Sequence, residues 1–84
     1  MKIQEYELLT CKELHNRLKE KIKGCVNCHV DSDTIKVQIK NGDFSFNYII
    51  YDLLEKIHIG FDYDRIVYDI CNCYSSAIRK KYFY

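Results

Sequence analysis

The last third of the chain, Phe61 to Tyr84, carries the pattern that most restricts the fold. Its apolar residues recur at i, i+1, i+4, i+5, i+8, i+11 and i+12, and at about 100° per residue these positions form one broad stripe on a helix. The stripe consists of Ile66, Val67, Ile70, Cys71, Tyr74, Ala77 and Ile78. Because so wide an apolar face has to be shielded from water, we expect the rest of the chain to pack against this helix.

Both ends of this helix carry the expected signals. Asp62 is suited to accept hydrogen bonds from the free N–H groups of the first turn, and Phe61 with Ile66 occupies the positions of a hydrophobic staple. The basic run Arg79-Lys80-Lys81 falls in the last turns, where positive charge suits the negative end of the helix dipole. The sequence therefore predicts a helix that starts just after Asp62.

A second helix is predicted near the N-terminus. Thr10 and Glu13 match a capping box, with Leu9 and Leu14 as the staple, so we expect a helix from Thr10 onward and a lead-in before it. Its apolar residues follow at intervals of three and four positions and are Cys11, Leu14, Leu18 and Ile22. We expect Gly24 to end the helix, since glycine adopts the left-handed conformation without strain.

In the middle of the chain, apolar and polar residues alternate. This pattern is typical of strands in a sheet with one buried and one solvent-exposed face. The alternation covers Cys25 to Val30 and Thr34 to Lys40, with polar turn residues between them. Asn41-Gly42 is a strong hairpin signal and predicts a third strand around Asp43–Asn47. A short helix is expected from about Ile49 onward, and residues 46–50 fit either element.

These elements predict one α+β domain that spans residues 1–84. We expect an N-terminal helix, a three-stranded antiparallel sheet, a short helix and a long C-terminal helix, with helices on one face of the sheet. A chain of 84 residues leaves no room for a second core.

Bulk properties narrow the range of functions. No stretch of about 20 apolar residues can span a membrane, and no signal-peptide core follows Met1. We therefore expect a cytoplasmic protein without a membrane partner, whose five cysteines stay reduced. The net charge of +1 is low for a non-specific nucleic-acid binder, although it leaves room for a local basic patch.

Cys25, Cys28 and His29 spell C-x-x-C-H, the attachment pattern of c-type haem, and Cys71 with Cys73 could complete a zinc site. The predicted elements oppose both interpretations. Residues three apart on a strand face opposite sides of the sheet, and residues two apart on a helix diverge by about 200°. We therefore expect neither metal nor cofactor, and interpret the cysteines as ordinary thiols.

The three histidines, His15, His29 and His58, lie on three different predicted elements. The sequence contains no phosphate-binding loop, dinucleotide fingerprint or H-E-x-x-H pattern, and so small a chain has little volume for a pocket. We expect no enzymatic activity and no catalytic residues.

The outward face of the long C-terminal helix is the first candidate for a binding surface. It carries the candidate partner-binding residues Arg65, Tyr68, Asn72, Arg79 and Phe83. Arginine and aromatic residues are enriched among the residues that dominate interface energies, with Tyr68 and Arg79 the expected anchors. The sequence thus favours a protein–protein interaction module, with either another protein or a second copy of the chain as partner.

The alternative is a small nucleic-acid-binding module that uses either the solvent-exposed face of the sheet or the C-terminal helix. The candidate residues on the sheet face are His29, Lys36, Gln38 and Lys40. The element order resembles that of double-stranded-RNA-binding domains, but the stretch Ile49-Ile50-Tyr51-Asp52-Leu53 lacks the basic cluster with which those domains begin the helix after the sheet. No RNA-contacting residues carry over from that family.

A broader resemblance covers most of the chain. The capped N-terminal helix, the polar-faced hairpin and the closing run Ile78-Arg79-Lys80-Lys81-Tyr82-Phe83 look like small accessory proteins of phages and prophages of low-GC Gram-positive bacteria, anti-CRISPR proteins among them. This resemblance implies a non-enzymatic binder that blocks a host or phage protein, and inhibition of a host defence protein is one form of that function. It assigns no functional residue.

Overall fold

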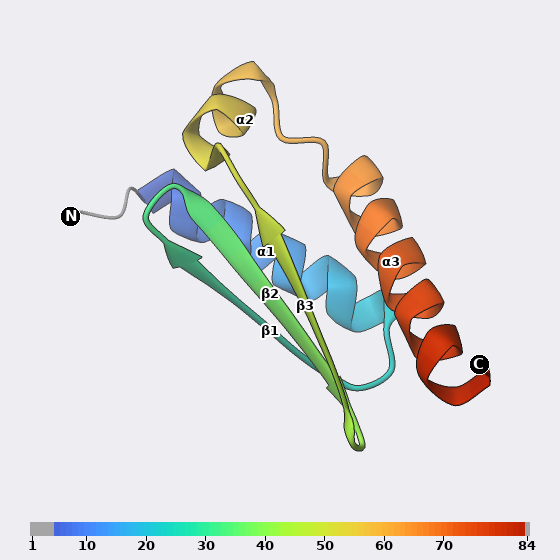
Figure 1. Cartoon of the computed structure of the whole chain (residues 1–84). Coiled ribbons are helices and arrows are strands. Elements are labelled where there is room, and N and C mark those ends of the chain that lie inside the picture. The colour runs from blue at the N-terminus through green and yellow to red at the C-terminus, as the bar shows by residue number, and fades with distance from the viewer. Residues whose placement is uncertain (1–4, 84) are drawn as a thin grey trace.

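The computed structural model of the protein describes residues 5–83. Helix α1 (Glu5–Lys21) is followed by the strands β1 (Cys25–Asp31), β2 (Thr34–Asn41) and β3 (Phe44–Ile50), and then by α2 (Leu53–Ile59) and α3 (Tyr63–Phe83). The strands form one antiparallel sheet in the order β1-β2-β3. The predicted α+β architecture is confirmed (Figure 1).

The molecule has two layers, with α1 and α3 packed against one face of the sheet (Figure 1). Alternate strand residues point into this interface, as the period of two requires. The buried side chains of the three strands are Val26, Ile35, Val37, Ile39, Phe44 and Ile50. They meet Leu14 and Leu18 of α1 and Ile70 of α3, all of which are fully buried. The predicted stripes of both helices therefore share one core.

The aromatic residue Tyr74 fixes α3 on the sheet. Its ring packs edge-on against Phe44 and Phe46 of β3, with ring centroids 5.9 and 5.8 Å apart. Its hydroxyl accepts a hydrogen bond of 3.1 Å from the side-chain amide of Asn41, at the end of β2. The C-terminal half of α3 therefore lies beside the turn between β2 and β3.

The start of α1 differs from the sequence prediction. The structure describes helix from Glu5 onward, and the Thr10 hydroxyl donates a 2.7 Å hydrogen bond to the carbonyl of Tyr6, four residues earlier. That bond places Thr10 inside the helix and not at its cap. The proposed staple is also wrong, because Leu9 is 59% exposed. The sequence alone does not distinguish the two cases, because a threonine at this position can bond either to the preceding turn of a helix or to the following one.

The boundary between β3 and α2 is resolved in favour of the strand, which runs to Ile50 and not to Asn47. Phe46 and Tyr48 are half-buried on the inner face, so the alternation that begins at Phe44 continues. Asp52 then adopts a left-handed conformation, with φ +52°, and turns the chain into α2. The N-terminus of α2 is held by Asp33 of the β1–β2 turn. The carbonyl of Asp33 accepts the Leu53 N–H at 3.0 Å, and its Oδ1 accepts the Leu54 N–H at 2.7 Å.

The start of α3 agrees with the prediction. Asp62 Oδ1 accepts the Arg65 N–H at 3.2 Å, and the Asp62 carbonyl accepts the Ile66 N–H at 3.1 Å. Asp62 is therefore the N-cap of a 21-residue helix. At about 1.5 Å per residue, α3 runs most of the 41 Å length of the molecule.

Candidate functional site

The strip predicted on α3 faces away from the core. Arg65, Asn72 and Arg79 are exposed, and Tyr68 is 67% exposed. The side chain of Phe83 lies outside the described residues. Because Arg65 and Arg79 are fourteen positions apart, they lie about 21 Å from each other along the helix. The four described residues therefore form an open strip and not a compact cluster.

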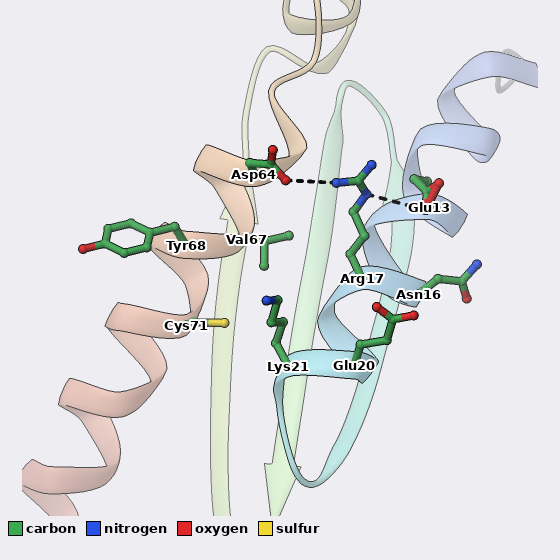
Figure 2. A pocket seen from close by; sticks show the side chains of 9 residues that line it. All are labelled: Glu13, Asn16, Arg17, Glu20, Lys21, Asp64, Val67, Tyr68 and Cys71. Atoms are coloured by element: carbon green, nitrogen blue, oxygen red, sulfur yellow. Dashed lines mark hydrogen bonds and ion pairs between the residues drawn. The ribbon is translucent and has the colours of Figure 1, made fainter.

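A groove between α1 and α3 lies beside this strip. It has a volume of about 600 Å³ and is lined by Glu13, Asn16, Arg17, Glu20, Lys21, Asp64, Val67, Tyr68 and Cys71. Figure 2 shows Val67 and Cys71 directed from α3 toward α1, while Tyr68 stands at the outer rim and points away from α1. Val67 is buried and Cys71 is half-buried. The groove therefore has a small apolar floor, charged walls and an aromatic rim.

Arg17 closes one end of the groove and links the two helices. Its guanidinium donates to Asp64 Oδ1 at 3.1 Å and forms an ion pair of 3.6 Å with Glu13 (Figure 2). The same group stacks on Tyr63, with the guanidinium carbon 4.7 Å from the ring centroid. Planar guanidinium groups suit this combination of stacking and carboxylate binding. The separation of α1 and α3 is thus set by side chains that also form the wall of the groove.

Cys71 is the only thiol that lines this groove within the described chain, and its environment does not activate it. Burial raises the pKa of the Cys71 thiol, and the nearby Lys21 ammonium offsets only part of that rise. Since the thiolate is the nucleophilic form, the raised pKa makes this thiol less reactive near neutral pH than an ordinary cysteine. The floor of the groove therefore offers an apolar contact surface with no activated thiol.

The remaining cysteines do not converge on one ion. Cys25 is exposed and Cys28 is half-buried, and because they are three positions apart on β1 they lie on opposite faces of the sheet. On α3, Cys71 is half-buried, whereas Cys73 is exposed. Among residues 5–83, no group of three or more His, Cys, Asp or Glu side chains could hold a metal ion.

The histidines lie apart, as predicted. His15 Nε2 donates a 2.7 Å hydrogen bond to the carbonyl of Val26, so this nitrogen carries a proton and the ring shields an edge group of β1. His29 is exposed on the outer face of the sheet, and His58 is exposed on α2. None of the three lines the α1–α3 groove.

The outer face of the sheet carries the other predicted set. His29, Lys36 and Lys40 are exposed and Gln38 is half-buried, and the register pairs His29 with Lys36 across β1 and β2. Lys36 forms an ion pair of 2.9 Å with Asp31, which lowers the pKa of the Asp31 carboxyl. Part of the positive charge on this face is therefore matched by a neighbouring carboxylate.

Sequence reasoning missed the groove, because its walls come from helices more than forty residues apart. Glu13, Arg17 and Glu20 have the spacing of residues on one side of a helix, but no local signal shows that this side faces α3. A comparison of the chain with protein-family models, curated proteins and solved structures gives no match. No helix within residues 5–83 is both long enough and apolar enough to cross a bilayer.

Proposed function

We propose that the protein is a non-enzymatic protein-binding module whose binding surface is the α1–α3 groove together with the adjacent outer strip of α3. The observation that carries this proposal is the position of Tyr68, which is 67% exposed at the rim of a groove of about 600 Å³. Protein interfaces combine an apolar or aromatic centre with a polar rim. Val67 and Cys71 supply an apolar floor and Tyr68 an exposed aromatic contact beside it, and the charged residues of α1 supply polar groups around them.

The chemistry of the groove supports binding over catalysis. Its only described thiol has a raised pKa, and none of the histidines lies in it. Its charged groups are partly paired with one another, with Arg17 held between Glu13 and Asp64. Such a surface matches a protein partner that places an apolar side chain between the helices and polar groups around it. Inhibition of a host defence protein is the form of this function that the resemblance to phage accessory proteins implies.

The residues of the outer strip of α3 differ in their distance from the groove. Arg79 lies eleven positions beyond Tyr68, or about 16 Å along the helix, and does not line the groove. Arg65 lies one turn before Tyr68 and Asn72 one turn after it. We therefore take Tyr68 as the centre of the protein-binding surface, with Arg65 and Asn72 beside it.

The test uses Tyr68→Ala with Tyr51→Ala as a matched control. Tyr51 is 61% exposed and lies outside the groove, so both variants remove an exposed tyrosine. Each protein is immobilised and exposed to nuclease-treated lysate of a low-GC Gram-positive host, and captured proteins are quantified by mass spectrometry. We expect a protein that wild type and Tyr51→Ala retain equally and that Tyr68→Ala loses at least tenfold, because an interface anchor is worth about 2 kcal/mol or more.

Neither substitution touches the core, so both should leave the free energy of unfolding within about 0.5 kcal/mol of wild type. A captured protein that binds all three chains equally would place the interface elsewhere. Failure to retain any protein in a Tyr68-dependent manner contradicts the proposed function.

A further inference from the structure

Basic residues from three separate segments converge on one end of the molecule. This end comprises the last turn of α1 with the loop after it, the turn between β2 and β3, and the last turns of α3 (Figure 1). We call it the basic end, and its lysines and arginines are Lys19, Lys21, Lys23, Lys40, Arg79, Lys80 and Lys81. It therefore holds seven of the chain's 13 lysines and arginines.

Contacts between the segments establish this convergence. Cys25, at the start of β1, pairs with Lys40, and the backbone of Gly24 passes close to the Lys40 carbonyl. Lys81 Nζ donates to the carbonyl of Asp43 at 3.4 Å and lies 5.8 Å from the ring centroid of Phe44. The segments around residues 23, 40 and 81 are thus neighbours in space.

The charges of the basic end are not neutralised locally. Only Glu20 and Asp43 are acidic in these segments, whereas the other ten of the chain's 12 acidic residues lie elsewhere. None of the seven basic side chains forms an ion pair within the described residues, in contrast to Arg17 and Lys36. Since the molecule measures only 22 by 20 Å across its long axis, this positive charge is concentrated on a small surface.

The net charge of +1 therefore understates the positive electrostatic potential that acts on an anion near the basic end. At physiological ionic strength, interactions between exposed charges are largely screened beyond about 8 Å. The molecule is 41 Å long, so the acidic residues of α2 and of the first turn of α1 are several such lengths away. An anion at the basic end responds to the local excess of lysine and arginine.

An exposed aromatic ring accompanies these cations. Tyr82 is 55% exposed, and its ring lies 5.8 Å from Lys81 Nζ. The Tyr82 ring also packs at a tilt of 53° against the buried Phe44, with centroids 6.5 Å apart, so a core residue supports it. A basic surface with a supported aromatic ring is typical of sites for single-stranded nucleic acid, in which phosphates meet cations and a base stacks on the ring.

We propose that the basic end binds the phosphate backbone of single-stranded nucleic acid, with Tyr82 stacking on one base. This function goes beyond the proposed protein binding: Tyr82 lies about 21 Å from Tyr68 along α3, although the two surfaces share Lys21 and Arg79. It also moves the nucleic-acid surface from the centre of the sheet, where Lys36 is paired with Asp31, to the end of the molecule.

The test measures fluorescence anisotropy of a labelled 20-nucleotide thymidine oligonucleotide as a function of NaCl concentration. Wild type is compared with Lys23→Ala/Lys80→Ala, which removes one cation from each of two segments of the basic end. The matched control, Lys12→Ala/Lys36→Ala, removes the same charge from α1 and β2 outside that end. We expect the first variant to reduce the slope of log K against log[salt] by about 1.4, and to lose about eightfold in affinity per contact at 50 mM salt.

A second pair of variants tests the stacking. Tyr82→Ala should lower affinity for the oligonucleotide at least fivefold with an unchanged salt slope, because stacking on a base is worth about 1–3 kcal/mol. Tyr68→Ala serves as its control and should bind the oligonucleotide like wild type. Protein capture should depend on Tyr68 and not on Tyr82, whereas oligonucleotide binding should depend on Tyr82 and not on Tyr68. Either proposal can therefore be contradicted while the other stands.

Three outcomes overturn the proposal. One is the absence of binding to the oligonucleotide at 20 mM salt. Another is equal weakening by the two double variants, which would show a response to net charge and no localised site. The third is binding of a duplex of the same sequence as tightly as the single strand, with no effect of Tyr82→Ala, which would assign the basic end to double-stranded backbone instead.

Discussion

The guanidinium carbon of Arg17 lies 4.7 Å from the ring centroid of Tyr63, so that a side chain of α1 stacks on the first residue of α3. The ion pair of Arg17 with Asp64 is the more visible contact in Figure 2, but the Asp64 side chain is 94% exposed. Exposed ion pairs contribute little because water and salt screen them. The stacking of the half-buried Arg17 on the Tyr63 ring is therefore the stronger connection between the helices.

Arg17→Ala should lower the free energy of unfolding by about 1 kcal/mol, through loss of the cation–π contact with Tyr63. Glu13→Gln removes one ion-pair partner of Arg17 and leaves the stacking intact, so we expect a change below about 0.5 kcal/mol. Urea denaturation of both variants measures the difference. A larger effect of Glu13→Gln would assign the connection to the ion pair.

The shared core predicts a strong contrast between two isoleucines. Ile70 is fully buried, so Ile70→Ala should cost roughly 2–5 kcal/mol, as should Leu18→Ala on α1. Ile59 is 75% exposed, and Ile59→Ala should change stability by less than about 0.5 kcal/mol. Thermal melts are sufficient, since 1 kcal/mol shifts the midpoint by roughly 4–8 °C in a domain of this size. An unchanged melt for Ile70→Ala would contradict the packing of α3 on the sheet.

Gly24 and Gly42 both have positive φ, but only Gly24 is confined by a neighbour. A Cβ at Gly24, where φ is +131°, would lie 2.7 Å from the Lys40 carbonyl oxygen, whereas a Cβ at Gly42 would meet no atom within 4 Å. Gly42→Ala should therefore cost only the backbone strain, about 1–2 kcal/mol. Gly24→Ala should cost more, because β1 has to move away from β2. Equal midpoints in urea would show that this clash is relieved without cost.

The environment of Cys28 predicts slow alkylation. Burial, with a smaller contribution from Cys11, raises the pKa of the Cys28 thiol to about 12. At pH 8 only about one in ten thousand Cys28 side chains is then a thiolate, against roughly a quarter for an ordinary thiol of pKa 8.5. Iodoacetamide followed by peptide mapping should label the exposed Cys25 and Cys73 long before Cys28. Early labelling of Cys28 would mean that the β1 edge opens readily.

The same raised pKa predicts how stability depends on alkaline pH. Between the ordinary thiol pKa and about 12, the unfolded chain has lost the Cys28 proton and the folded chain retains it. Stability should therefore fall as the pH rises through this range. Cys28→Ala removes this titration, so its unfolding midpoint in urea should decline less between pH 8 and pH 10 than that of wild type. An equal decline in the two proteins would assign the alkaline loss to other groups.

Sequence patterns predicted most of the fold because most of its determinants are local. The apolar stripe and the Asp62 cap placed α3 correctly, and the alternation of β1 and β2 matches the observed register. The predictions were wrong or undecided where one sequence pattern is compatible with two local structures. Thr10 could bond the turn before it or the turn after it, and residues 46–50 fitted both periods until their burial against α3 was known.

The candidate surfaces were predictable only in part. The exposure of Tyr68, Arg65, Asn72 and Arg79 follows from the helical period and is confirmed. The groove and the basic end depend on which segments become neighbours, and that information is not contained in local spacing. Lys23, Lys40 and Lys81 lie far apart in the sequence, and they meet because β1 pairs with β2 and because α3 packs beside the β2–β3 turn.

The hydrogen bonds that Asp33 accepts from the first N–H groups of α2 affect the order in which the chain folds. A helix of seven residues does not form by itself, since nucleation costs more than so few bonds return. Its first two N–H groups find their acceptors only once β1 and β2 have paired and the turn between them is closed. We expect α2 to order after the transition state for folding, so that Asp33→Ala accelerates unfolding in stopped-flow experiments and leaves the refolding rate nearly unchanged.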